Sequence, residues 1–162
     1  MSYVRNFAEL KVRANQGPPN KALQLTSREG AIVLERAEVG PEGTPADEDV
    51  PVNVTVDAQG FAAADQSWIV ASDWATFLAE FEALTERRQG KAALVGASPE
   101  DLRVEFFSTD RAGHMAVQGH VKRSGPRGFN LELRFGFAFE PDELPRVLAE
   151  LRSFTVATGG ER

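Results

Sequence analysis

Residues 129–140 read FNLELRFGFAFE, and this alternation is the strongest structural signal in the chain. Apolar side chains occupy every second position, and polar or small residues stand between them. A period of two is that of a strand with one buried and one solvated face. The stretch therefore predicts a long strand, whose buried side carries Phe129, Leu131, Leu133, Phe135, Phe137 and Phe139.

The segments before this strand show the same period. Residues 102–106 and 114–122 alternate in the same way, so we expect a three-stranded antiparallel meander with one wet face. Earlier in the chain, alternating runs bounded by turn residues predict four more strands. They are expected at 22–25, 31–39, 52–56 and 61–71.

Two amphipathic helices follow the two groups of strands. The first is expected near residues 73–88, capped by Ser72 or Asp73, and its apolar stripe is Trp74, Phe77, Leu78, Phe81 and Leu84. The second is expected near 142–153, with the stripe Leu144, Val147, Leu148, Leu151 and Phe154. The predicted fold class is α+β: predominantly antiparallel sheets of about seven strands, packed against two amphipathic helices. A strands-then-helix pattern occurs twice.

The length of 162 residues fits one domain. We expect a single α+β domain over residues 22–154. Gln16–Asn20 contains two adjacent prolines, which break regular structure, so residues 1–21 are predicted to be a flexible tail. Residues 155–162 end in a glycine pair and are predicted to be a frayed tail.

The charge balance restricts the class of partner. The net charge is −6 and the sequence pI is about 5.0. An acidic surface repels phosphates and anionic lipid, so neither nucleic acid nor membrane is an expected partner. The opening residues lack the apolar run of a secretory signal, which predicts a cytoplasmic protein. The chain has no cysteine, which excludes disulfides and thiolate sites.

Residues capable of chemistry are few. His114 and His120 lie six positions apart, roughly 20 Å along a strand, which is too far to share one zinc ion. Glu105 and Glu132 lie on polar strand faces, where Arg103 and Arg134 offer simple cross-strand charge pairs. No nucleotide or nucleophile motif is present. We therefore expect no catalytic residue, metal or cofactor.

The candidate partner-binding residues are an acidic run and one tryptophan. Asp47, Glu48 and Asp49 lie in a segment rich in proline and glycine, residues 40–51. Such a run is either a solvated loop or a docking patch for a basic protein. Trp68 lies near a predicted strand end, where it is either core or partly exposed.

The order of these elements resembles a known family. The residues that carry the resemblance are Gln66–Val70, Ser72–Leu78, Leu102–Phe106, His114–Val121, Phe129–Phe135 and the closing helix with Leu144, Leu148 and Leu151. Over roughly residues 30–154 the chain resembles the WapI family of bacterial immunity proteins. The resemblance implies a cytosolic antitoxin that blocks the toxic tip of a large polymorphic toxin, without catalytic residues of its own.

Three functional classes remain open from the sequence. The first is a non-catalytic immunity protein that binds a cognate toxin domain, for which a basic domain would suit the acidic chain. The second is a small-molecule-binding module or enzyme that uses a pocket between sheet and helices. The third is a homodimer formed through an exposed sheet edge, although a monomer is favoured.

Overall fold

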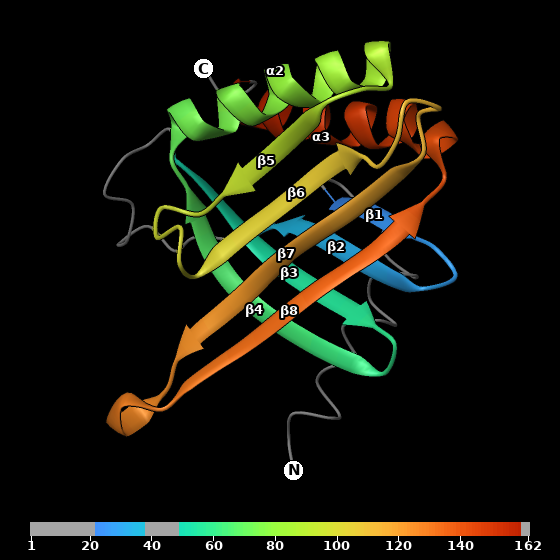
Figure 1. Ribbon diagram of the computed structural model, residues 1–162. Helices are drawn as coiled ribbons and strands as arrows, with labels where there is room; N and C mark the ends of the chain where they lie inside the picture. Colours follow the sequence, from blue (N-terminus) through green and yellow to red (C-terminus); the bar gives the residue numbers. More distant parts are fainter. Residues whose placement is uncertain (1–21, 38–48, 160–162) are drawn as a thin grey trace.

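The computed structural model describes residues 22–37 and 49–159, and its order of elements is two rounds of four strands and a helix (Figure 1). The first round is β1 (Ala22–Thr26), β2 (Gly30–Arg36), β3 (Val50–Ala58), β4 (Phe61–Ile69) and α2 (Ala71–Arg87). The second is β5 (Lys91–Val95), β6 (Leu102–Ser108), β7 (Met115–Ser124), β8 (Asn130–Phe139) and α3 (Leu144–Gly159). Short 3-10 turns, Pro126–Gly128 and Pro141–Glu143, flank β8.

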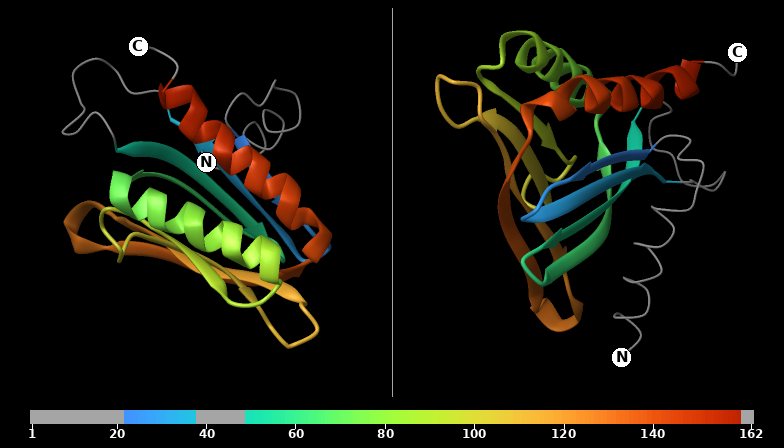
Figure 2. Two further views of the ribbon diagram at one scale, coloured as in Figure 1. Left: turned by 90° about the horizontal axis from the view of Figure 1, so that it is seen from above. Right: turned by 90° about the vertical axis from the view of Figure 1, so that its right-hand side faces the viewer.

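The strands form two antiparallel sheets, each in chain order. Sheet A is β1-β2-β3-β4 and sheet B is β5-β6-β7-β8. In Figure 1 the strands of sheet B cross in front of those of sheet A, the arrangement of a sandwich with crossed strand directions. Figure 2 shows α2 and α3 side by side over one end of the sheets.

The predicted fold class is confirmed, with one addition. Eight strands are present, because Lys91–Val95 forms β5 between α2 and β6. This strand has five residues, two of them alanines, and so short a run of weak strand formers gives little signal. Helix α3 extends to Gly159, so its backbone continues into the segment expected to fray. The predicted tail at 1–21 lies outside the described residues.

The core between the sheets and the helices is apolar throughout. No polar or charged residue is buried among the described residues. Aromatic rings link the layers, with ring centroids 5.3 Å apart for Phe81 and Phe106 and 6.2 Å apart for Phe106 and Phe139. Both predicted helical stripes point into this core, and only Leu78 of the ten side chains is partly exposed.

Carboxylates protect three of the four sheet edges. A glutamate oxygen accepts a hydrogen bond from one edge N–H in each case: Glu150 at Gln24 of β1 (3.2 Å), Glu80 at Ala93 of β5 (3.2 Å) and Glu29 at Ala138 of β8 (2.9 Å). Along β4, the Trp68 carbonyl accepts from the Ala97 N–H at 2.6 Å. Occupied edge groups oppose the addition of a strand from another molecule at those points.

Gly119 in β7 is required by the closeness of β6. A Cβ at this position would lie 2.0 Å from the Arg103 carbonyl oxygen, which no real side chain tolerates. At Gly136 in β8, by contrast, a Cβ would meet its nearest neighbour, Gln118 Cβ, at 3.6 Å, an ordinary contact. In the strands of sheet B, the backbone therefore excludes a side chain at Gly119 and has room for a methyl group at Gly136.

We predict that Gly119→Ala lowers the free energy of unfolding by roughly 1–3 kcal/mol, because β6 and β7 must move apart. The matched control, Gly136→Ala, is expected to leave the free energy unchanged or to raise it by about 0.4–1 kcal/mol. Urea denaturation of both variants measures the difference. Equal stabilities would show that the close approach at Gly119 carries no cost.

Candidate functional site

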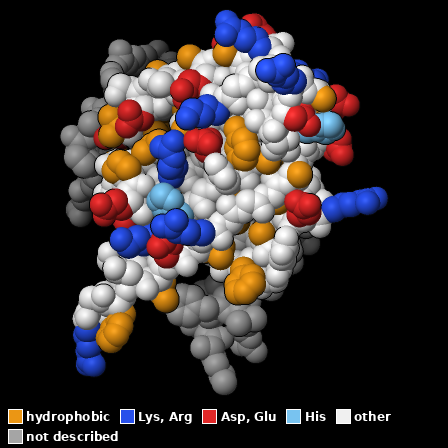
Figure 3. Space-filling model, viewed as in Figure 1, with side chains coloured by type: hydrophobic (Ala, Val, Ile, Leu, Met, Phe, Trp, Pro, Cys, Tyr) orange, Lys and Arg blue, Asp and Glu red, His pale blue; other side chains and the backbone are white. Residues whose placement is uncertain are grey.

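Charged side chains gather on the outer face of sheet B, the side turned away from sheet A. Along β6, β7 and β8 they alternate with the buried residues. Figure 3 shows this face, on which acidic and basic side chains are interleaved. The strong binary pattern found in the sequence thus builds the core on one side and a polar surface on the other.

Three of these side chains form a transverse row, which we call the basic row. Arg103 of β6 lies opposite His120 of β7, which lies opposite Arg134 of β8. Direct cross-strand neighbours have Cβ atoms about 4.5–5.5 Å apart, so the His120 side chain lies between those of the two arginines. In another row of the same face the neighbours carry opposite charges, since Lys122 faces Glu132.

Each arginine of the basic row is held by a carboxylate of its own strand. Arg103 Nη2 lies 3.1 Å from Glu105 Oε2, and Arg134 Nε lies 3.1 Å from Glu132 Oε1. Gln118 donates to the other oxygen of Glu105 at 3.2 Å. These contacts orient the guanidinium groups and leave several of their N–H donors for other acceptors.

The ion pairs lie within strands, so the prediction of cross-strand pairs was wrong. Strand β7 separates β6 from β8, and Glu105 and Glu132 therefore lie on strands that are not neighbours. The carboxylates therefore do not face each other across a cleft as glycoside hydrolysis requires.

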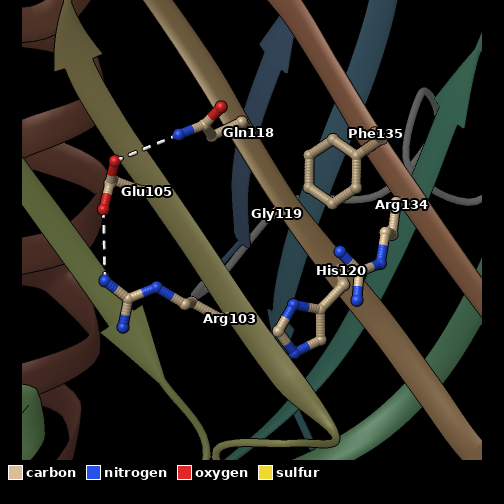
Figure 4. Close-up of a pocket in the computed structure, with 7 residues that line it drawn as sticks. All are labelled: Arg103, Glu105, Gln118, Gly119, His120, Arg134 and Phe135. Carbon is tan, nitrogen blue, oxygen red and sulfur yellow. Dashed lines mark hydrogen bonds and ion pairs between the residues drawn. The ribbon is translucent and has the colours of Figure 1, made fainter.

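A hollow of about 290 Å³ opens beside the basic row. Figure 4 shows the side chains of the basic row around it, with Phe135 next to its cross-strand partner Gly119. His120 Nε2 lies 3.2 Å from the carbonyl oxygen of Pro99, so this nitrogen carries a proton that it donates there. No serine, threonine or cysteine lines the hollow. The arrangement is suited to binding an anionic group rather than to nucleophilic chemistry.

The two histidines have separate surroundings. His114 lies in the loop before β7, and its Nδ1 is 2.6 Å from Asp110 Oδ2. The other Asp110 oxygen accepts from the backbone N–H groups of Ala112 (3.0 Å) and His114 (3.2 Å). Over residues 22–37 and 49–159, no group of three or more His, Asp or Glu side chains is placed to hold a metal ion.

The hydrogen bond from the His114 side chain lowers the pKa of Asp110 below its ordinary value, and desolvation opposes this only in part. Because the folded-state pKa lies below the unfolded value, ionised Asp110 stabilises the loop above about pH 4. This contribution is lost as the pH falls through the folded-state pKa.

We predict that His114→Ala raises the pKa of Asp110 toward that of an ordinary aspartate. A ¹³C NMR titration of the Asp110 carboxyl group measures the shift. His120→Ala is the control and is expected to leave the Asp110 titration unchanged. An unchanged Asp110 pKa in His114→Ala would contradict the assignment of the hydrogen bond as the main cause.

The structure places two of the candidate partner-binding residues at one end of the β3–β4 pair. Asp49 immediately precedes β3, and its Oδ1 accepts from the Ala71 N–H at 3.2 Å. Trp68 lies opposite Pro51 near the end of β4, where it is half-buried. Asp47 and Glu48 lie outside the described residues.

The predicted capping of the first helix by Ser72 or Asp73 was wrong. The N-cap residue of α2 is Val70, and neither Ser72 nor Asp73 makes a capping side-chain bond. The orphan N–H of Ala71 is instead satisfied by Asp49, which is distant in the chain. A carboxylate at a helix N-terminus also interacts favourably with the helix dipole.

We predict that Asp49→Ala lowers the free energy of unfolding by about 1 kcal/mol, the usual cost of losing a capping side chain. Asp49→Asn keeps an acceptor oxygen and is expected to retain most of the stability. Ser72→Ala is the control and is expected to leave the free energy of unfolding unchanged. Thermal or urea denaturation distinguishes these variants. An Asp49→Ala variant as stable as the wild type would show that Asp49 does not stabilise the start of α2.

A solved structure shares this overall arrangement. The crystal structure of Trypanosoma brucei MRP1/MRP2 matches with a TM-score of 0.51 at 16% sequence identity, covering 97% of this chain and 97% of that chain. At this identity the likeness concerns the fold alone. No curated protein sequence matches the chain.

The class that the family comparison defines is that of an immunity protein. The Immunity protein WapI-like family matches residues 15–158, nearly the whole chain. The chain belongs to this family, which confirms the resemblance found in the sequence. Neither helix in the described part of the chain has the length and apolar composition needed to cross a membrane.

Proposed function

We propose that this chain binds a cognate toxin domain in the cytoplasm of the producing cell and neutralises it without catalysis. Membership of the WapI-like immunity family supports this role. A toxin blocked in this way is covered rather than chemically changed, so the inhibitor needs a stable surface and no reactive group. The chain is expected to act as a monomer.

The observation that carries this proposal is the separation of apolar and polar groups. All described ionisable side chains lie at the surface, and the space between the sheets and the helices is filled by apolar side chains. A pocket between sheet and helices, which the alternative function requires, is therefore not favoured. The hollow beside the basic row opens on the outer face of sheet B, where a partner can reach it.

The acidic run remains a proposed part of the contact. The net charge of −6 favours approach to a basic partner. Asp47 and Glu48 are the residues of the run chosen for the test, because the Asp49 carboxylate also accepts a hydrogen bond from Ala71 at the start of α2. We also propose that Trp68, half-buried at the same end of sheet A, contributes apolar contact.

The test is co-expression with the toxin domain encoded next to this chain. We expect that the chain restores growth of cells that produce the toxin and co-purifies with it at equal stoichiometry. A toxin variant without toxicity serves as the control for expression burden. Continued toxicity together with no complex would overturn the proposed function.

The same complex tests the acidic run. Asp47→Lys combined with Glu48→Lys is expected to slow association and to make the association rate less sensitive to salt. Stopped-flow measurements at two salt concentrations report both quantities. An unchanged association rate would show that the acidic run is not part of the contact with the toxin.

A further inference from the structure

We propose that the basic row is a docking site for a carboxylate side chain of the toxin domain, so that the partner contributes an Asp or Glu to the outer face of sheet B. The inference rests on the proposed function and names one contact of it. The site consists of Arg103, His120 and Arg134, with the hollow beside them.

The first argument is the position of the two arginines. Arg103 and Arg134 lie on either side of His120 on three neighbouring strands, so no carboxylate stands opposite either arginine within the row. Lys122 and Glu132, in a nearby row, show the stabilising alternative. Departures from locally favourable pairing are expected where a surface serves another purpose.

The second argument is which charges reach the solvent. The Arg103 side chain is 43% exposed but its partner Glu105 only 15%, and the values for Arg134 and Glu132 are 82% and 35%. The carboxylates therefore lie lower than the guanidinium groups that they orient. A partner at this point therefore meets the guanidinium groups before the carboxylates, although the chain as a whole is acidic.

The third argument is chemical fit. A guanidinium has five N–H donors in a planar fork that matches a carboxylate, and its pairing with Glu105 or Glu132 uses only part of them. Phe135 and the bare backbone of Gly119 add an apolar wall. A hollow of about 290 Å³ has room for a side chain with an apolar stem and an anionic end.

A protein carboxylate fits this site better than a nucleic acid backbone. Glu105 and Glu132 flank the row, and the net charge of the chain is −6. A phosphate chain would pass over both carboxylates and meet repulsion along its length. A single carboxylate between the arginines meets the guanidinium groups first.

The experiment compares two double charge reversals of equal net charge. Arg103→Glu with Arg134→Glu alters the basic row, and Arg28→Glu with Arg111→Glu changes two exposed residues in turns elsewhere. Calorimetric titration with the co-encoded toxin domain measures the dissociation constant. We expect at least a tenfold loss of affinity for the first variant and less than a twofold change for the control.

The outcomes separate this inference from the proposed function. Wild-type chain that fails to bind the toxin overturns both. If the basic-row variant binds the toxin domain with the affinity of the wild type, the docking site alone is overturned. A wild-type chain that binds single-stranded RNA, with binding lost in the same variant, also overturns it in favour of a phosphate ligand.

Folding of the variants is controlled separately. Thermal melting followed by circular dichroism reports whether the charge reversals keep the fold. If they unfold the protein, Arg103→Gln with Arg134→Gln removes the charges at similar side-chain size. This variant is then expected to lose the same contact, and retained affinity would overturn the inference.

Discussion

The rest of the structure depends on the packing of α2 against the strands that follow it in sequence. Helix α2 closes the first round of elements, yet it packs on β5, the first strand of the second round. Its Phe77 ring lies 6.1 Å from that of Phe106 in β6 and its Trp74 ring 5.5 Å from that of Phe154 in α3. Burying each such ring is worth roughly 1.5–3 kcal/mol. The helix therefore joins the two halves into one core.

An apolar core of this kind leaves the ionisable groups to the surface. The edges of the sheets illustrate the consequence. The carboxylates of Glu29, which is exposed, and of Glu80 and Glu150, which are half-buried, each occupy a backbone N–H that would otherwise be open to another strand. Such occupied edges oppose the homodimer considered from the sequence. Recognition of another protein is thereby directed to sheet faces and loops rather than to strand addition at these points.

Much of the fold could be predicted from the sequence, because its strongest signals are periodic. The alternation in residues 133–139 and the stripe that begins at Trp74 each report a buried face directly. The prediction was wrong for Phe129 and Leu131, which are 74% and 69% exposed where the β7–β8 hairpin extends beyond the core. The cap of α2 could not be predicted, since Asp49 is brought to Ala71 only by the β3–β4 hairpin. The basic row was missed for a related reason. The strand faces of Arg103 and Arg134 were predicted correctly, but only the register aligns both with His120.

The acidic net charge of the chain and the exposed arginines of the basic row can both contribute to binding one partner. Net charge acts over the Debye length of about 8 Å in physiological salt, and so it mainly affects the rate of encounter. The basic row acts at contact distance, where oriented guanidinium groups discriminate between partners by hydrogen-bond geometry. A partner of basic net charge that places one carboxylate over the row satisfies both conditions, whereas a uniformly basic protein satisfies only the first. Specificity for one toxin among many basic ones then depends on the opposite charge at a single point.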